Sequence, residues 1–190
     1  MSYSYIIWVV AGPAGCGKST IAEYLSKEFN GPYVEGDDLH DSASITKMSH
    51  GIALNDEDRG PWLDKIIPET LKAIRELHGT ETGHHYGFVT CSSLKKKYRD
   101  HIRASARSLR DHRGISIGVR FLFVTVDEEV LIERVRARPN HYMKEPMVTS
   151  QLNIMELPTI SESDSLLLNS TGKTKEEINA LAKKDVLSLP

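Results

Sequence analysis

Residues 12–20 are Gly12-Pro13-Ala14-Gly15-Cys16-Gly17-Lys18-Ser19-Thr20, which satisfies the pattern G-x-x-x-x-G-K-[S/T] in full. This stretch follows the apolar, β-branched run 6–10, which predicts a buried strand, and it precedes a helical pattern with apolar residues at 21, 22, 25 and 29. The backbone N–H groups of such a loop and the positive end of the helix dipole bind phosphate oxygens. The sequence therefore predicts a site for a nucleoside triphosphate.

Individual residues of this loop have expected roles. Lys18 should contact the β- and γ-phosphates of ATP, and the Ser19 hydroxyl should bind Mg²⁺ directly. The other expected ATP contacts are Gly12, Ala14, Gly15, Cys16, Gly17 and Thr20. A glycine-rich loop formed by chance is the alternative, and the predicted strand and helix on its two sides make it the weaker one.

Composition limits the class of protein. A chain of 190 residues is long enough for one domain with a single core, and 39% hydrophobic with 26% charged residues is typical of a soluble globular domain. The net charge of −2 gives no electrostatic support for binding nucleic acid or a membrane. No apolar run approaches the roughly 20 residues of a membrane span, and the N-terminus lacks the basic region of a secretory signal. We expect a cytoplasmic protein whose two cysteines, Cys16 and Cys91, are reduced.

Predicted strands and helices alternate along the chain. Strands are expected at 6–10, 33–34, 88–91, 121–126 and 166–168. Helices are expected after residue 20, at 61–77, 94–109, 128–138 and 148–156, and after Thr174, which begins a capping-box pattern. The polar residues 79–87 predict a loop. This alternation predicts an α/β fold of the P-loop NTPase type, with three α/β/α layers around a five-stranded parallel sheet.

Acidic residues follow the second predicted strand, in the segment Glu35-Gly36-Asp37-Asp38-Leu39-His40. Because ligands gather at the carboxyl ends of strands in open α/β sheets, these carboxylates should face the phosphate loop. Glu35 and Asp37 lie two residues apart, so they share one side of an extended chain. One could hold Mg²⁺ through water while the other accepts a hydrogen bond from the hydroxyl that is phosphorylated. The alternative is an acidic turn that caps a helix.

Two basic features are candidates for binding an acidic substrate. Arg59 follows the acidic residues 56–58, and it either pairs with them or supplies a bidentate guanidinium to a substrate carboxylate. Residues 94–113 are rich in lysine and arginine but lack the interleaved aromatic residues on which single-stranded nucleic acid stacks. We therefore expect a partly solvated helix face from which one or two lysines, Lys96 among them, reach an anionic substrate.

Basic residues also surround Pro139, at the end of the helix predicted over 128–138. Arg134 and Arg138 lie four residues apart and so project from one face of that helix, and His141 follows. A cationic helix end beside a loop is typical of a lid that closes over a phosphoryl group during transfer. The alternative is that the arginines only stabilise the C-terminus of their own helix.

Together, these motifs resemble those of small P-loop gluconokinases, which are related to shikimate and adenylate kinases. The resemblance covers residues 5–168. It rests on GPAGCGKST at 12–20, EGDDLH at 35–40, KMSHGIALNDEDRGPWL at 47–63, CSSLKKKYRD at 91–100, ARPNHYMK at 137–144 and SQLNIMEL at 150–157. Shikimate and adenylate kinases share the phosphate loop but not this set of motifs.

The resemblance implies a single kinase domain over 1–190 that transfers the γ-phosphate of ATP to the 6-hydroxyl of D-gluconate with the help of Mg²⁺. Residues 38–78 would form the substrate-binding segment and 134–150 the lid, and many such kinases are homodimers. It implies catalytic roles for Lys18, Asp37 and Arg138, and an ATP contact for Arg134. The residues implied to bind the sugar acid are Asp37, His40, Lys47, Arg59, Lys96 and His141. Glu35, where this family usually has aspartate, would reach Mg²⁺ through water.

Two other functions are compatible with a phosphate loop. The first is a kinase that acts on another small hydroxy acid or on a nucleotide, and the second is a non-catalytic switch of the GTPase type. A GTPase would carry an N-K-x-D segment, which the sequence lacks. A nucleoside monophosphate acceptor would need several arginines in residues 40–75, where the chain has Arg59 and Arg75. Both absences favour a singly charged sugar acid as the acceptor.

Overall fold

The computed structural model describes residues 4–79, 83–109, 116–137 and 145–189. Its centre is a sheet of five parallel strands in the order β2-β3-β1-β4-β5. The strands are β1 (Ser4–Ala11), β2 (Tyr33–Val34), β3 (His84–Thr90), β4 (Ser116–Thr125) and β5 (Ser165–Asn169). The predicted five-stranded parallel sheet is confirmed.

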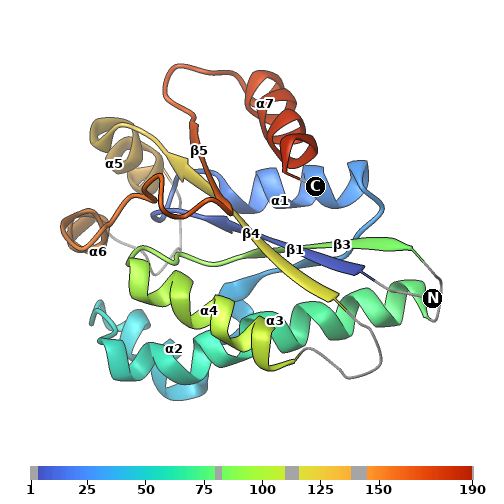
Figure 1. Cartoon of the computed structure of the whole chain (residues 1–190). Helices are drawn as coiled ribbons and strands as arrows, with labels where there is room; N and C mark the ends of the chain where they lie inside the picture. The colour runs from blue at the N-terminus through green and yellow to red at the C-terminus, as the bar shows by residue number, and fades with distance from the viewer. Residues whose placement is uncertain (1–3, 80–82, 110–115, 138–144, 190) are drawn as a thin grey trace.

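Helices cover both faces of the sheet (Figure 1). They are α1 (Lys18–Glu28), α2 (Ser42–Ser49), α3 (Asp56–His78), α4 (Lys96–Ser108), α5 (Glu128–Arg136), α6 (Glu145–Asn153) and α7 (Lys175–Ser188), with the short 3₁₀ helix η1 (Gly36–Leu39). The pair α1 and α7 lies on one face and the pair α3 and α4 on the other, so the three-layer α/β/α prediction is also confirmed. The helices α5 and α6 pack against each other near the end of β4.

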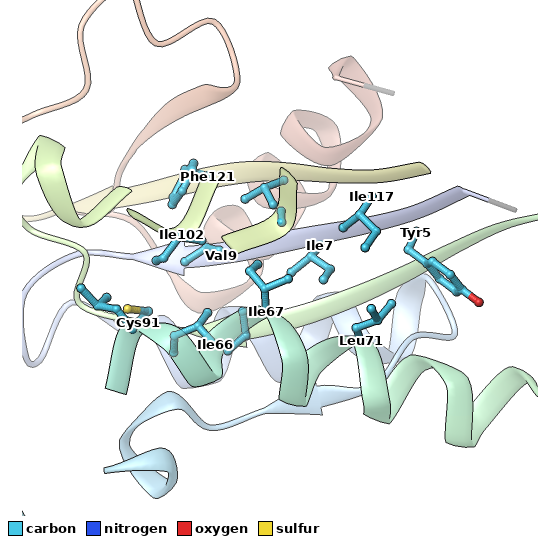
Figure 2. Packing of buried hydrophobic residues seen from close by; sticks show 14 of the residues in the cluster. Tyr5, Ile7, Val9, Ile66, Ile67, Leu71, Cys91, Ile102, Ile117 and Phe121 are labelled. Atoms are coloured by element: carbon cyan, nitrogen blue, oxygen red, sulfur yellow. The ribbon is translucent and has the colours of Figure 1, made fainter. Parts of the chain in front are cut away.

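The central strand β1 divides its side chains between the two faces, because successive residues of a strand point in opposite directions. Ile7 and Val9 are fully buried against α3, where Figure 2 shows them facing Ile66 and Ile67. Trp8 belongs to the second core, together with residues of α1, α5, α6 and α7, and it is also fully buried. Both faces of β1 are therefore apolar, as expected for a central parallel strand.

Several elements begin earlier than the sequence-based expectation, among them β4, at Ser116 instead of 121, and α6, at Glu145 instead of 148. β3 begins at His84 instead of 88, and its extra residues pair with Ser4–Ile7 of β1. Glycine is uncommon inside strands, so Gly87 made this segment look like a loop. The structure explains why glycine is present: a Cβ atom at position 87 would lie 2.6 Å from the Cδ1 atom of Ile74. α3 begins at Asp56, five residues before the proline expected in its first turn. Asn55 caps this helix, because its side chain accepts a hydrogen bond from the N–H of Asp58 at 2.8 Å. The capping box predicted at Thr174 is present at the start of α7.

The register of the sheet brings the carboxyl ends of its central strands to one edge. Val10 of β1 is aligned with Thr90 of β3 and with Leu122 of β4. The segment after β2 packs against the same edge, where the Gly36 N–H donates to Thr90 Oγ1 at 2.9 Å. The loops that follow β1, β2 and β3 are therefore neighbours, and a ligand between them would contact all three.

The close approach at Gly36 leads to a prediction about stability. A Gly36→Ala variant should lose about 3 kcal/mol of unfolding free energy, the upper end of the usual cost of overpacking. The reason is that the new methyl group would lie 1.8 Å from the backbone oxygen of Thr90. Thermal denaturation followed by circular dichroism measures the loss. Gly60→Ala is the control, because a methyl group there meets no atom within 4 Å. Equal melting temperatures for Gly36→Ala and the unaltered protein would contradict this packing.

A buried ion pair ties the segment after α6 to the start of α4. Arg99 is fully buried, and its Nε and Nη2 atoms donate to the two carboxylate oxygens of Glu162 at 2.8 and 2.7 Å. Its Nη1 atom donates to the backbone oxygens of Ser93 at 3.1 Å and Glu156 at 2.9 Å. The hydrogen bond from Arg99 lowers the pKa of Glu162 to about 2, against the opposing effect of burial. This pair fixes the turn after β3 relative to the end of α6.

Candidate active site

A cleft of about 500 Å³ opens at the carboxyl edge of the sheet. Its walls come from the phosphate loop, the segment 35–40, the residues before and within the first turns of α3, the turn after β3, and α6. It brings together eight of the residues singled out in the sequence: Ala14, Gly15, Lys18, Ser19, Glu35, Asp37, His40 and Arg59. These residues come from three separate stretches of the chain and meet in one cavity.

The phosphate loop has the backbone geometry that its glycines allow. Gly12, Gly15 and Gly17 have φ angles of 134°, 83° and 98°, a region that side chains disfavour. A Cβ atom on Gly12 would lie 2.4 Å from the backbone oxygen of Val124, so the loop packs directly against β4. α1 begins immediately after Gly17, at Lys18, and its first backbone N–H groups are available to an anion.

The side chains of the loop differ in exposure. Ser19 and Thr20 are exposed at the start of α1, and Lys18 is half-buried with its Nζ atom 3.0 Å from the backbone oxygen of Pro13. Cys16 is buried, and burial raises the pKa of its thiol, so it packs as an apolar group. Arg134 of α5 reaches the loop, with Nη1 3.5 Å from the backbone oxygen of Gly15. The predicted ATP contacts are thus gathered around one loop.

Glu35 is the centre of a hydrogen-bond cluster beside this loop. Its carboxylate accepts a hydrogen bond from Ser19 Oγ at 2.8 Å, and it also accepts from the hydroxyls of Tyr33 and Thr90. Burial alone would raise the pKa of Glu35, but the hydrogen bonds from Thr90, Tyr33 and Ser19 outweigh it and hold the pKa below its ordinary value. The carboxylate therefore stays ionised at neutral pH, next to the hydroxyl predicted to bind Mg²⁺.

The segment after Glu35 carries the predicted proton acceptor. Asp37 and Asp38 are exposed on η1 and line the cleft. His40 stacks on Trp62 of α3, with ring centroids 4.3 Å apart, and the Trp62 Nε1 atom donates to the backbone oxygen of Gly36 at 2.7 Å. Burial lowers the pKa of His40, and although Asp37 opposes this, the nearby charge of Arg59 adds to the lowering. His40 is therefore a neutral imidazole at pH 7.

Arg59, in the first turn of α3, also lines the cleft. It is 8% exposed, its Nη2 atom donates to the backbone oxygen of Leu54 at 3.3 Å, and its guanidinium lies 5.7 Å from the centre of the Tyr98 ring. Within the described ranges it forms no ion pair with its acidic neighbours, and its buried Nε atom has no hydrogen-bond partner. A buried guanidinium with unused donors at a cleft wall suits an anionic group of a ligand.

Four of the predicted substrate or lid residues are not seen in the cleft. Neither Lys47 nor Lys96 is among the described residues that line the cleft, and their ammonium groups pair instead with Asp58 and Asp100, each at 2.6 Å. Arg138 and His141 fall outside the described residues. Besides Lys18 of the phosphate loop, the lysine that lines the cleft within the described residues is Lys95, the residue immediately before α4.

Other cleft residues were missed in the sequence. Asn55, Asp56, Trp62, Ser92 and Tyr98 line the cleft, and all belong to stretches that carry the resemblance. Gln151 of α6 is the least expected of them, because its side-chain oxygen accepts a hydrogen bond from the backbone N–H of Ala14 at 2.8 Å. A glutamine on a distant helix gives no signal of a contact with the phosphate loop, apart from its place in SQLNIMEL.

Comparisons with known proteins agree with this geometry. A profile of AAA domains matches residues 9–155. The chain is 40% identical to a probable gluconokinase of Saccharomyces cerevisiae, over 95% of this chain and 88% of the relative, and 39% identical to one of Schizosaccharomyces pombe, over 94% and 87%. The chain belongs to the gluconokinase family. A crystal structure of a gluconokinase from Sinorhizobium meliloti 1021 superposes with a TM-score of 0.75 at 32% identity, covering 100% of this chain and 95% of that one.

Membership of the gluconokinase family makes this protein an enzyme, an ATP-dependent P-loop kinase. A GTPase-type switch without catalytic activity is thereby excluded. Within the described residues, no helix is long and apolar enough to cross a membrane. The gluconokinase motifs at 12–20, 35–40, 47–63 and 91–100 all contribute residues to the cleft described above.

Proposed function

We propose that this kinase transfers the γ-phosphate of ATP to the 6-hydroxyl of D-gluconate, giving 6-phospho-D-gluconate and ADP. The observation that carries the proposal is a single cleft lined by the phosphate loop, the carboxylate of Asp37 and the guanidinium of Arg59. An acceptor with a hydroxyl at one end and a carboxylate at the other matches these two groups. The names of the related gluconokinases support the same acceptor.

The proposed reaction uses each group once. Lys18 and the backbone N–H groups at the start of α1 bind the β- and γ-phosphates and hold them in line with the acceptor. The Asp37 carboxylate accepts the proton of the 6-hydroxyl of gluconate while the oxygen of that hydroxyl forms a bond to the γ-phosphorus. The bond from that phosphorus to the bridging oxygen breaks, and ADP leaves. Arg59 holds the carboxylate of gluconate, which orients the hydroxyl end toward the phosphates.

The donors beside the phosphate loop suit Mg²⁺. The hydroxyl oxygen of Ser19 and a carboxylate oxygen of Glu35 lie 2.8 Å apart, and both are hard ligands. Mg²⁺ in kinases takes one or two such protein ligands together with phosphate oxygens and water. Among the described residues no group of three acidic, cysteine or histidine side chains forms a closed cage. When bound, Mg²⁺ would neutralise charge on the phosphates. Ser19 would contact it directly, and Glu35 would orient Ser19 and a metal-bound water.

The lid and the substrate segment are part of the same proposal. Residues 134–150 would cover the phosphates, and the contact between Arg134 and the backbone of Gly15 supports this for one end of the segment. Arg138 would stabilise charge on the transferring phosphoryl group, and His141 would contact the acceptor. Residues 38–78, which include His40 and Arg59, would form the acceptor wall.

An ADP-release assay with a panel of acceptors tests the proposed reaction. The panel consists of D-gluconate, other aldonic acids, shikimate, AMP and the neutral polyol sorbitol, each with ATP and Mg²⁺. D-gluconate should give the highest kcat/KM, and phosphorus NMR of the product should show a phosphate ester at the 6-position. A higher kcat/KM for shikimate or AMP, or a product phosphorylated elsewhere, would contradict the proposal.

An Arg59→Lys variant should separate the binding of the two substrates. Lysine keeps the positive charge but loses the planar, bidentate geometry of the guanidinium, so KM for gluconate should rise about tenfold while KM for ATP changes little. Steady-state kinetics with each substrate varied in turn measures both constants. Arg75→Lys, on the same helix, is the control. If KM for ATP rises as much as KM for gluconate, Arg59 does not act as a carboxylate ligand.

A further inference from the structure

Two neighbouring lysines at the start of α4 have different surroundings. The Lys95 side chain is 22% exposed and lines the cleft, whereas the Lys96 side chain is 50% exposed and is bound to Asp100 of the following turn. We propose that Lys95, held in place by Asp56, is a second carboxylate-binding residue beside Arg59, and that the pair selects acids over neutral polyols. This inference rests on the proposed function and names the part of the site that recognises the acid group.

The first support is the way Tyr98 brings the two cations together. The Lys95 Nζ atom lies 5.4 Å from the centre of the Tyr98 ring, and the Arg59 guanidinium lies 5.7 Å from the same centre. The two charges come from different helices, yet both contact one aromatic ring at the cleft wall. An aromatic face attracts cations without neutralising them. Lys95 shares the carboxylate of Asp56 with Lys97, and Arg59 forms no ion pair within the described residues, so this part of the cleft wall keeps a net positive charge.

The second support is that both cations retain unused donors. The Lys95 ammonium has three N–H donors, and its one hydrogen bond within the described residues goes to Asp56 Oδ1 at 3.0 Å. Arg59 Nε is buried without a partner, and its Nη2 atom makes only the 3.3 Å contact with Leu54. A carboxylate has two oxygens that accept such donors, so one group could satisfy both residues.

The role of Asp56 is to hold Lys95 against the wall. Its carboxylate accepts hydrogen bonds from Lys95, Lys97 and the Tyr98 hydroxyl. The hydrogen bonds from Lys97, Tyr98 and Lys95 keep the pKa of Asp56 well below its ordinary value, so the carboxylate is ionised throughout the physiological range. Asp56 thus acts on substrate through Lys95 and is a positioning residue.

The distribution of charge in the cleft supplies the direction of binding. Glu35 is hydrogen-bonded to Ser19 of the phosphate loop, and Asp37 and Asp38 follow it, so carboxylates gather near the phosphates. Lys95 and Arg59 stand at the ends of α4 and α3 that face the cleft. An acid group is repelled from the first region and attracted to the second, which leaves the hydroxyl end of the acceptor near the γ-phosphate.

Matched lysine variants test this assignment. Lys95→Met should raise KM for gluconate by about 10- to 100-fold, the range for a lost hydrogen bond to a charged group, with KM for ATP within about twofold. Lys72→Met removes one positive charge from the exposed face of α3 and controls for net charge. Lys96→Met provides the direct comparison, because it removes the neighbouring lysine. A larger effect at Lys96 than at Lys95 would overturn the proposal.

The ratio of kcat/KM for gluconate to that for sorbitol is the second readout. It should fall in Lys95→Met, fall less in Lys95→Arg, and fall in Asp56→Asn without a comparable change in KM for ATP. Melting temperatures identify variants that are only destabilised, and Lys95→Arg keeps the test decisive if Lys95→Met does not fold. An unchanged ratio in both folded Lys95 variants would overturn the proposal.

The outcome also distinguishes this inference from the proposed function. If the unaltered enzyme uses gluconate and Lys95→Met behaves like Lys72→Met, the inference is wrong and the proposed function stands. If the unaltered enzyme prefers another acid, the same comparison is made with that acid and its neutral analogue. If it prefers a neutral acceptor, both are wrong.

Discussion

A Lys18→Ala variant should lose turnover by about 10³-fold or more, because the transferring phosphoryl group loses the cation that stabilises its charge. Lys18 stands at the first position of α1 and lines the cleft, and its ammonium now contacts only backbone oxygen among the contacts described above. Since that contact is local, the substitution should not disturb the fold. Single-turnover measurement of ADP release at saturating ATP isolates the chemical step from binding.

The control for this variant is Lys27→Ala, an exposed lysine at the other end of α1. It removes the same charge and the same side chain from the same helix, and it should keep near-normal turnover. Near-normal turnover in a correctly folded Lys18→Ala variant would mean that the loop binds nucleotide without taking part in phosphoryl transfer.

Asp37→Asn should lower kcat by about 10²–10⁴, the usual effect of removing a positioned proton acceptor, and should change KM for ATP little. The substitution keeps the size of the side chain but replaces an anionic carboxylate, which can take a proton, with a neutral amide, which cannot. Asp37 is exposed on η1 and lines the cleft, so the fold does not depend on its burial. Steady-state kinetics between pH 5 and 9 would show the loss across the whole range.

Asp38→Asn is the matched comparison, because Asp38 is the next residue of the same 3₁₀ helix and also lines the cleft. Its effect on kcat should be much smaller. A large rise in KM for ATP in Asp37→Asn, with kcat nearly unchanged, would assign Asp37 to metal or nucleotide binding. A larger loss in Asp38→Asn would assign proton transfer to Asp38.

Much of this architecture could be predicted from the sequence, since the deciding signals are local. The phosphate loop requires glycines at fixed positions. The continuous apolar run of β1 indicates a strand that is buried on both of its faces. The acidic segment after β2 was expected at the same edge because parallel strands align their carboxyl ends there. Each of these inferences uses residues within about ten positions of one another, and strand alternation then determines the layers.

Features that depend on distant contacts could not be predicted. Lys95 and Lys96 are adjacent and chemically identical, and only the exact start of α4 decides which one lines the cleft. The start of β3 was missed because His84 and Gly87 disguise a strand that is completed by pairing with β1. The hydrogen bond between Gln151 and Ala14 joins residues 137 positions apart, and no local pattern encodes it.

The ion pair between Arg99 and Glu162 has a consequence for how the chain assembles. Its partners are 63 positions apart, and it ties the turn beside the cleft to a segment that is synthesised late. A contact between residues far apart in the sequence requires a long loop to close, which costs conformational entropy before the contact stabilises the chain. Such contacts therefore tend to form late in folding. A nascent chain that ends before Glu162 holds the complete nucleotide motif but lacks this tie. The protein therefore has the sequence of a phosphate-binding loop long before it has a finished catalytic pocket.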